Sequence, residues 1–139
     1  MNEKITLQID TAGELRAFAK DINSGRYHGQ PDLTVKLTAD IDLGGLDQWV
    51  PIGCGGHFFS GAFDGCGHTV RNMIIKKDYP GSYGLFGFCT GTIENLNVTG
   101  SITCVAGDVH SAVGGIAGLV VGGQINNCAA DLTIDSNRL

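Results

Sequence analysis

Residues 86–98, with the sequence FGFCTGTIENLNV, decide the fold because two other parts of the chain share their pattern. The earlier segment is 63–75 (FDGCGHTVRNMII), and the later one is 116–130 (IAGLVVGGQINNCAA). In this alignment a β-branched residue, an asparagine two positions later and the apolar or thiol residue after it correspond in all three segments. The three sets are Val70, Ile93 and Ile125; Asn72, Asn95 and Asn127; and Met73, Leu96 and Cys128. The steps of 23 and 32 residues indicate internal repeats.

A step near 23 residues fits one coil of a β-helix, whereas helical repeats of about 33 residues or more need two helices each. The repeat region also lacks a helical period and is rich in glycine. A single coil cannot bury its apolar face alone, but stacked coils can. We therefore predict an all-β fold, a short right-handed parallel β-helix (solenoid), as one domain over 1–139 with β-coils at 33–135.

The recurring asparagines predict a structural ladder of Asn72, Asn95 and Asn127. Asparagine tolerates the left-handed backbone conformation of a corner, and its amide can bond to the coil above or below.

The start of the chain carries a helix signal. Thr11-Ala-Gly-Glu14 has the form of a capping box, and Gly25 is suited to end a helix. The spacing between them predicts a helix over 11–24 that caps the N-terminal coil. Its apolar stripe is Leu15, Phe18, Ala19 and Ile22.

Composition excludes several classes of function. The chain has 139 residues, a net charge of −5 and 22 glycines, against about ten expected at average usage. No lysine or arginine lies between Gly81 and Asn137, which excludes a nucleic-acid groove in the repeats. No apolar stretch approaches the roughly 18 residues of a membrane-spanning helix, so we expect no membrane insertion.

Two glycine-bounded pairs, Gly84-Leu85-Phe86-Gly87 and Gly115-Ile116-Ala117-Gly118, resemble the GLUG motif. The flanking segments 37–43, 49–53 and 59–65 are similar to the lead-in of that family, and the resemblance covers roughly 8–135. It implies a β-helical module of bacterial surface proteins, including adhesins and parts of IgA peptidases. In those proteins the repeats bind or space, and the peptidase chemistry lies in another domain.

A cluster of potential zinc ligands consists of Cys54, His57, Cys66 and His68. Their spacing is unlike that of a zinc finger. We therefore expect no metal and no cofactor.

Candidate catalytic groups are the carboxylates Asp40, Asp42 and Asp64. They form no acid ladder, because Asp64 aligns with Gly87, so we expect no enzyme activity. Cys66 and Cys89 take the same place in successive coils of this alignment. A disulfide and two free thiols both remain open, and the odd number of five cysteines favours free thiols.

Nothing comparable to the N-terminal helix follows the last predicted strand. Its edge and the end of its apolar core are therefore expected to be bare, which predicts an interface at Leu132, Ile134 and Leu139. This end would join two copies as a homodimer, dock on a partner, or meet the rest of a longer chain. The alternative is that residues 136–139 fold back over it.

These features favour a non-enzymatic module that recognises a protein partner or a surface glycan. The alternative is a complete intracellular protein, encoded by a prophage, that inhibits a host or defence protein by stoichiometric binding. The first implies a cell-surface or secreted location. The second implies a cytoplasmic location with Met1 as the native start. A polysaccharide-active enzyme is disfavoured by the carboxylate arrangement.

Overall fold

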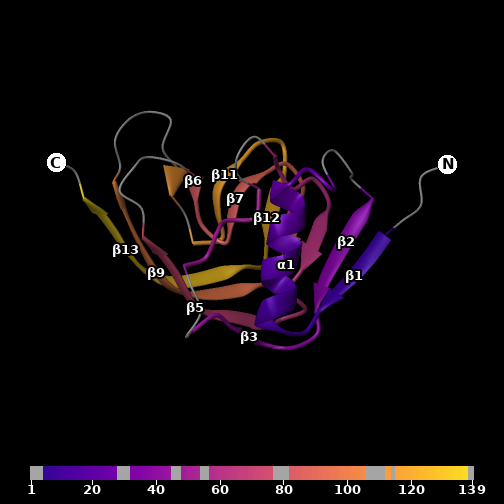
Figure 1. Cartoon of the computed structure of the whole chain (residues 1–139), viewed down its shortest axis with the longest axis horizontal. Helices are drawn as coiled ribbons and strands as arrows, with labels where there is room; N and C mark the ends of the chain where they lie inside the picture. Colours follow the sequence, from indigo (N-terminus) through magenta and orange to yellow (C-terminus); the bar gives the residue numbers. More distant parts are fainter. Residues whose placement is uncertain are drawn as a thin grey trace.

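A computed structural model of the chain describes residues 5–27, 32–44, 48–53, 57–76, 82–105, 112–113 and 115–137 (Figure 1). The chain is a parallel β-solenoid of about four turns with one short helix, which confirms the predicted fold class. The strands are β1 (Ile5–Ile9), β2 (Leu33–Leu37), β3 (Ile41–Asp42), β4 (Ala62–Asp64), β5 (Thr69–Lys76), β6 (Ser82–Tyr83), β7 (Phe86–Cys89), β8 (Thr92–Glu94), β9 (Asn97–Val105), β10 (Ala112–Val113), β11 (Ala117–Val120), β12 (Gln124–Asn126) and β13 (Ala129–Asn137). The helix is α1 (Ala12–Asn23).

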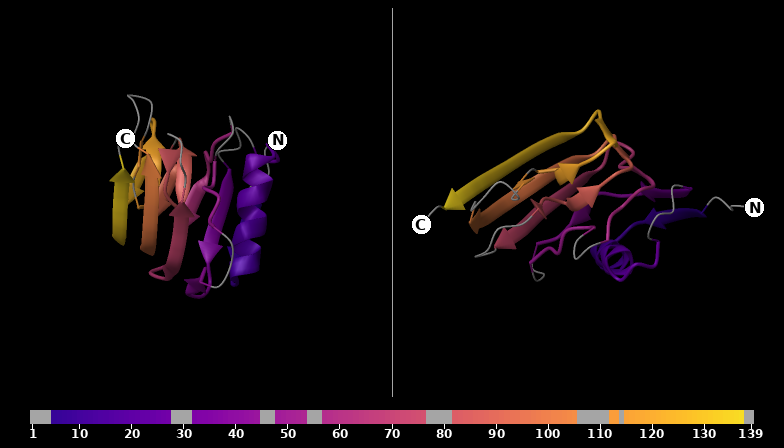
Figure 2. Two further views of the ribbon diagram at one scale, coloured as in Figure 1. Left: turned by 60° about the vertical axis from the view of Figure 1, so that its left-hand side comes forward. Right: turned by 90° about the horizontal axis from the view of Figure 1, so that it is seen from above.

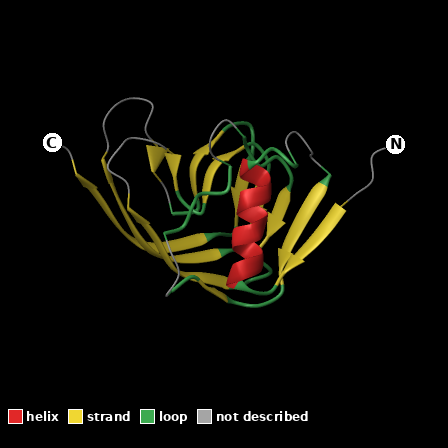
Figure 3. Cartoon of the chain, viewed as in Figure 1, coloured by secondary structure: helices red, strands yellow, loops and turns green. Residues whose placement is uncertain are grey.

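Strands that are far apart in the sequence lie side by side because successive coils stack (Figures 2 and 3). One sheet has the order β1-β2-β4-β8-β12, and a second has the order β3-β5-β9-β13. The other sides of the coils are the pairs β6-β10 and β7-β11. All these pairs are parallel, as expected when each coil follows the path of the one before it.

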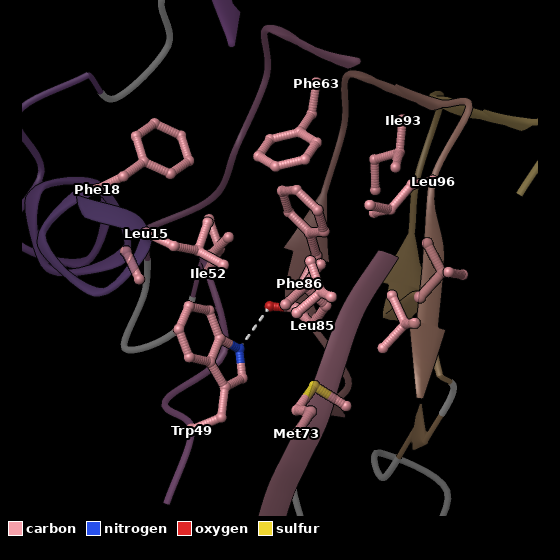
Figure 4. Close-up of a cluster of buried hydrophobic side chains, with 14 of the residues drawn as sticks. Leu15, Phe18, Trp49, Ile52, Phe63, Met73, Leu85, Phe86, Ile93 and Leu96 are labelled. Atoms are coloured by element: carbon pink, nitrogen blue, oxygen red, sulfur yellow. Dashed lines mark hydrogen bonds between the residues drawn. The ribbon is translucent and has the colours of Figure 1, made fainter. Parts of the chain in front are cut away.

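The core consists of vertical columns of apolar side chains, one residue from each coil. Val35, Phe63 and Ile93 form one such column and are each 0% exposed. Phe86, one coil side away, packs against Phe63 with 5.1 Å between ring centroids (Figure 4). The indole N–H of Trp49 donates to the Leu85 carbonyl at 2.9 Å, so this buried polar group is satisfied.

The N-terminal end of this core is closed by α1. Thr11 is its N-cap, the capping box with Glu14 is complete, and Gly25 takes a positive φ of 91° just past the end. These features confirm the helix predicted over 11–24. Its buried face includes Phe18, whose ring lies 6.3 Å from that of Phe63. The predicted capping role of the helix thus follows from its contacts with the first coils.

The predicted repeat step of 23 residues is wrong. Phe63 pairs with Ile93, which pairs with Ile125, so the steps are 30 and 32 residues. Val70 pairs with Val98, not with Ile93. The predicted alignment placed residues from different sides of the coil on one another, because an asparagine follows a β-branched residue on more than one side.

The two GLUG-like pairs lie in register on adjacent coils. Phe86 pairs with Ala117, and its N–H donates to the carbonyl of Ile116 at 2.9 Å. On the opposite side, Phe86 bridges to Ile52 of the preceding coil. The motif residues therefore form one wall of the solenoid.

Three glycines stack at the same point of successive coils, directly before β4, β8 and β12. A Cβ on Gly91 would overlap the carbonyl oxygen of Gly61, and a Cβ on Gly123 would overlap that of Gly91. Close approach of the backbones at this corner thus requires glycine. The stack lets each coil turn into the next sheet without lifting away from the coil below.

We expect Gly91→Ala to destabilise the fold by about 3 kcal/mol or more, since the new methyl group has only backbone atoms to displace. Chemical denaturation followed by circular dichroism measures this. Gly13→Ala is the matched control, because Gly13 lies exposed in α1 with space for a Cβ. That variant should gain about 0.5–1 kcal/mol. Equal stability of the two variants would contradict the close-approach argument.

Candidate binding surface

The C-terminal coil, formed by β12 and β13, is the open end of the solenoid. Figure 2 shows α1 at one end of the stack and β13 at the other. In the sheets, β12 and β13 are edge strands that pair on one side only. Their outer backbone groups are free to pair with another polypeptide.

Core columns that are fully buried in the inner coils become exposed in this last coil. Ile125 continues the column of Phe63 and Ile93, yet it is 41% exposed while they are 0% exposed. Leu132 lies over Gly100 in the second sheet and is half-buried. Val121, beside the same end, is 51% exposed. An exposed apolar surface of this kind is typical of an interaction site.

The predicted interface residues lie at this end as far as the structure describes them. Leu132 is in β13 and continues an inward-facing column. Ile134 is also in β13 and pairs with the buried Ile102, but its side chain is outside the description. Leu139 lies outside the described residues. The missed members of the surface are Val121 and Ile125, and the correct coil register would have identified Ile125.

A ladder of side-chain amides runs along the corner between the two large sheets. Asn127 donates from Nδ2 to Oδ1 of Asn95 at 2.8 Å, and Asn95 donates from Nδ2 to Oδ1 of Asp64 at 3.2 Å. Asn95 and Asn127 have positive φ values of 55° and 52°. Cys66 takes the left-handed corner conformation in the coil below, with a φ of 54°.

Asn72 is not part of this ladder, which corrects the prediction. It lies in β5, at the bulge between Val70 and Met73, and donates from Nδ2 to Asp42 at 2.8 Å. Its φ of 59° explains why it resembled the other two asparagines. The left-handed conformation there serves a bulge within a strand and not a corner between strands.

The carboxylates considered as catalytic candidates are all engaged in local hydrogen bonds. The Thr69 N–H and the His68 ring, at 3.0 and 3.1 Å, hold the pKa of Asp40 below its ordinary value of 3.8. The Asn72 amide, followed by the Gly44 N–H, likewise lowers the pKa of Asp42.

Asp64 is at the base of the amide ladder. Partial burial raises its pKa, but hydrogen bonds from the Cys66 N–H and the Asn95 amide outweigh this and lower it overall. Asp64 is therefore ionised at neutral pH, and its Oδ1 accepts both hydrogen bonds. This arrangement suits a structural carboxylate better than a general acid.

The three thiols that the structure describes are free, and none is activated. Burial raises the pKa of Cys89 to about 11, and burial also raises the pKa values of Cys66 and Cys128. Cys66 is exposed at a corner, whereas Cys89 is buried in β7 and pairs with Val120. The predicted equivalence of Cys66 and Cys89 in successive coils is therefore wrong.

The four potential zinc ligands do not meet as a described cluster. His68 bonds to Asp40, and His57 lies against Gly25 at the end of α1. Cys54 lies outside the described residues. Within the described part of the chain, no three histidine, cysteine, aspartate or glutamate side chains are grouped to hold a metal ion.

A groove of about 300 Å³ lies between α1 and residues 48–53, and the sequence analysis missed it. Trp49, Val50 and Ala19 contribute to its lining, with Arg16 and Lys20 nearby. The Arg16 guanidinium lies 5.7 Å from the centre of the Trp49 ring and donates to the Gln48 carbonyl. These contacts hold α1 against the second coil.

Comparison with known proteins gives one relative of low identity. Halomucin of Haloquadratum walsbyi is 30% identical over 141 residues, a match that covers 94% of this chain and 1% of halomucin. The chain thus spans about 1% of the length of the curated relative it matches. No family model and no solved structure matches the chain. The helix that the structure describes is too short to cross a membrane.

We expect Asn95→Ala to destabilise the fold by about 1–3 kcal/mol, because it leaves a ladder partner without its hydrogen bond. Asn95→Gly isolates the amide, since glycine adopts the positive φ without strain. Urea denaturation measures both variants. Asn126→Ala, on the neighbouring exposed residue, should stay within about 0.5 kcal/mol of the parent chain. A loss confined to Asn95→Ala and absent in Asn95→Gly would assign the effect to backbone strain alone.

We also expect acid to weaken the contribution of Asp64. A carboxyl group with a lowered folded-state pKa stabilises the fold above its unfolded-state value, and this contribution is lost as pH falls through the folded pKa. Asp64→Asn should therefore be less stable than the parent chain at pH 6, and the difference should shrink below about pH 4. Urea midpoints at several pH values measure it, with the exposed Asp131→Asn as control. A difference that stays constant down to pH 3 would show that the ionised form is not the stabilising one.

Proposed function

We propose that this chain is a non-enzymatic binding module that recognises a protein partner through its open C-terminal coil. The observation that carries the proposal is the change in exposure along one core column. Phe63 and Ile93 are 0% exposed, whereas Ile125, at the end of the same column, is 41% exposed. A partner that covers this end would bury the column and pair with the edges of β12 and β13.

The chemistry of the ionisable groups supports binding over catalysis. Asp40, Asp42 and Asp64 have lowered pKa values because hydrogen bonds within their own corners stabilise the ionised forms. The pKa values of Cys66 and Cys89 are raised, so little of the nucleophilic thiolate is present at neutral pH. These groups are suited to hold turns together.

A protein partner is favoured over a surface glycan by the kind of groups that the open end presents. Its exposed side chains Val121 and Ile125 are aliphatic, and its strand edges offer backbone donors and acceptors. Such edges are the standard docking site for an added strand. The GLUG resemblance favours a module of a bacterial surface protein, and the match to a small part of halomucin fits a unit carried within longer chains.

The double variant Ile125→Lys with Leu132→Lys tests the proposal, because two cations at the bare end would oppose burial against a partner. The immobilised parent chain is exposed to bacterial and host lysates, and each captured protein is then purified and titrated directly. We expect saturable binding that the double variant weakens at least tenfold. A glycan array is probed in parallel with the same two chains.

Ile74→Lys is the matched control, since Ile74 is 39% exposed in β5, away from the open end, and should leave binding unchanged. Thermal melts of all variants establish that they are folded. Binding that is lost equally in the control and the double variant would contradict the proposed surface. Binding only to glycans, unaffected by the double variant, would contradict the proposed partner class.

A further inference from the structure

The amide ladder has a direction that its chemistry fixes. The ionised carboxylate of Asp64 can only accept, so Asn95 must turn its Nδ2 towards Asp64 and its Oδ1 towards the next coil. Asn127 must then donate to Asn95, as observed at 2.8 Å. Its own Oδ1 is left as an acceptor at the open end, where it meets no donor among the described residues. The ladder therefore ends on a group that a further donor can satisfy.

The backbone at the same corner repeats this pattern. In the inner coil, the Asn95 N–H donates to the Asn126 carbonyl above it, at 3.1 Å. The carbonyls of Gly91 and Leu96 accept from Gln124 and Ala129 of the last coil, at 3.0 and 2.9 Å.

By register, Gly123, Asn127 and Cys128 are the equivalents of Gly91, Asn95 and Leu96 one coil later. The open corner thus presents one donor, the Asn127 N–H. It presents three acceptors, which are the carbonyls of Gly123 and Cys128 and the side-chain Oδ1 of Asn127. None of the four bonds to another described residue. A polypeptide segment with the same path as β8, the Asn95 corner and β9 would complement all four groups.

We propose that the partner covers this end by adding a parallel coil, with an amide-bearing residue such as asparagine at the corner that donates to Oδ1 of Asn127. This inference rests on the proposed function and specifies the chemistry of its partner. The partner is an extended segment that pairs with β12, turns at the corner in the left-handed conformation and then pairs with β13. Its apolar side chains extend the columns that end at Ile125 and Leu132.

A second copy of this chain does not fit the same end. Its first strand, β1, is followed directly by Thr11 and α1, so it offers no strand corner to place over Asn127. Two copies joined end to end by a two-fold axis would each present the ladder acceptor and offer the other ladder no amide donor. The hydrogen-bonding pattern therefore favours a different polypeptide.

The probe for this inference is a synthetic peptide with the sequence of residues 91–105, carrying Cys104→Ser to prevent oxidation. It contains its own Asn95 corner and is titrated into the isotope-labelled full chain by NMR. We expect saturable shifts of the backbone N–H and side-chain amide of Asn127. A peptide with Asn95→Asp, which turns a carboxylate towards Oδ1 of Asn127, should bind about fivefold more weakly or worse.

The double-mutant cycle uses Asn127→Gly in the full chain, which keeps the positive φ and removes the amide. This variant should no longer distinguish the two peptides, whereas Asn126→Ala should distinguish them as the parent chain does. Equal binding of a reversed-sequence peptide, or a symmetric dimer that blocks the end, would overturn the inference. If the peptides fail to bind but the Ile125→Lys and Leu132→Lys variant still loses its captured protein, the parallel-coil inference falls and the proposed function stands.

Discussion

Successive coils of this solenoid lie directly on one another, and every core column, corner bond and strand pair depends on equivalent positions staying in register. The stacked glycines 61, 91 and 123 permit that close approach, because a side chain at any of them would overlap the backbone below. Once the backbones are this close, parallel hydrogen bonding and the alignment of apolar side chains follow. No coil could bury its own apolar residues without its neighbours.

The features that were predictable from sequence are those with local causes. The helix over 11–24 was predictable because its capping box, apolar stripe and terminal glycine all lie within a few residues of one another. The solenoid class was predictable from repetition and glycine content. The register was not, because Asn72 in a strand bulge and Asn95 at a corner share a left-handed backbone and similar neighbours. Distinguishing them requires the position of Cys66, whose φ of 54° marks the real corner in a residue type that rarely adopts it.

The candidate surface was predictable in location more than in detail. The lack of a helical signal after residue 132 indicated a bare end, and Leu132 lies there. Ile125 was misplaced because its column was misassigned, so its exposure could not be inferred. The groove beside Trp49 depends on how α1 packs against residues 48–53, and that angle is a tertiary property with no local sequence signal.

The position of α1 at the N-terminal end also has a consequence for biosynthesis. The ribosome releases β1, α1 and the first coil before any of the later strands. The closed end of the solenoid is therefore available as a finished template while the rest is still being made. Each new coil then needs to order only its own residues on an existing edge, so the long-range topology is assembled through a series of short-range steps. A solenoid closed at its other end would have to wait for its template until translation was complete.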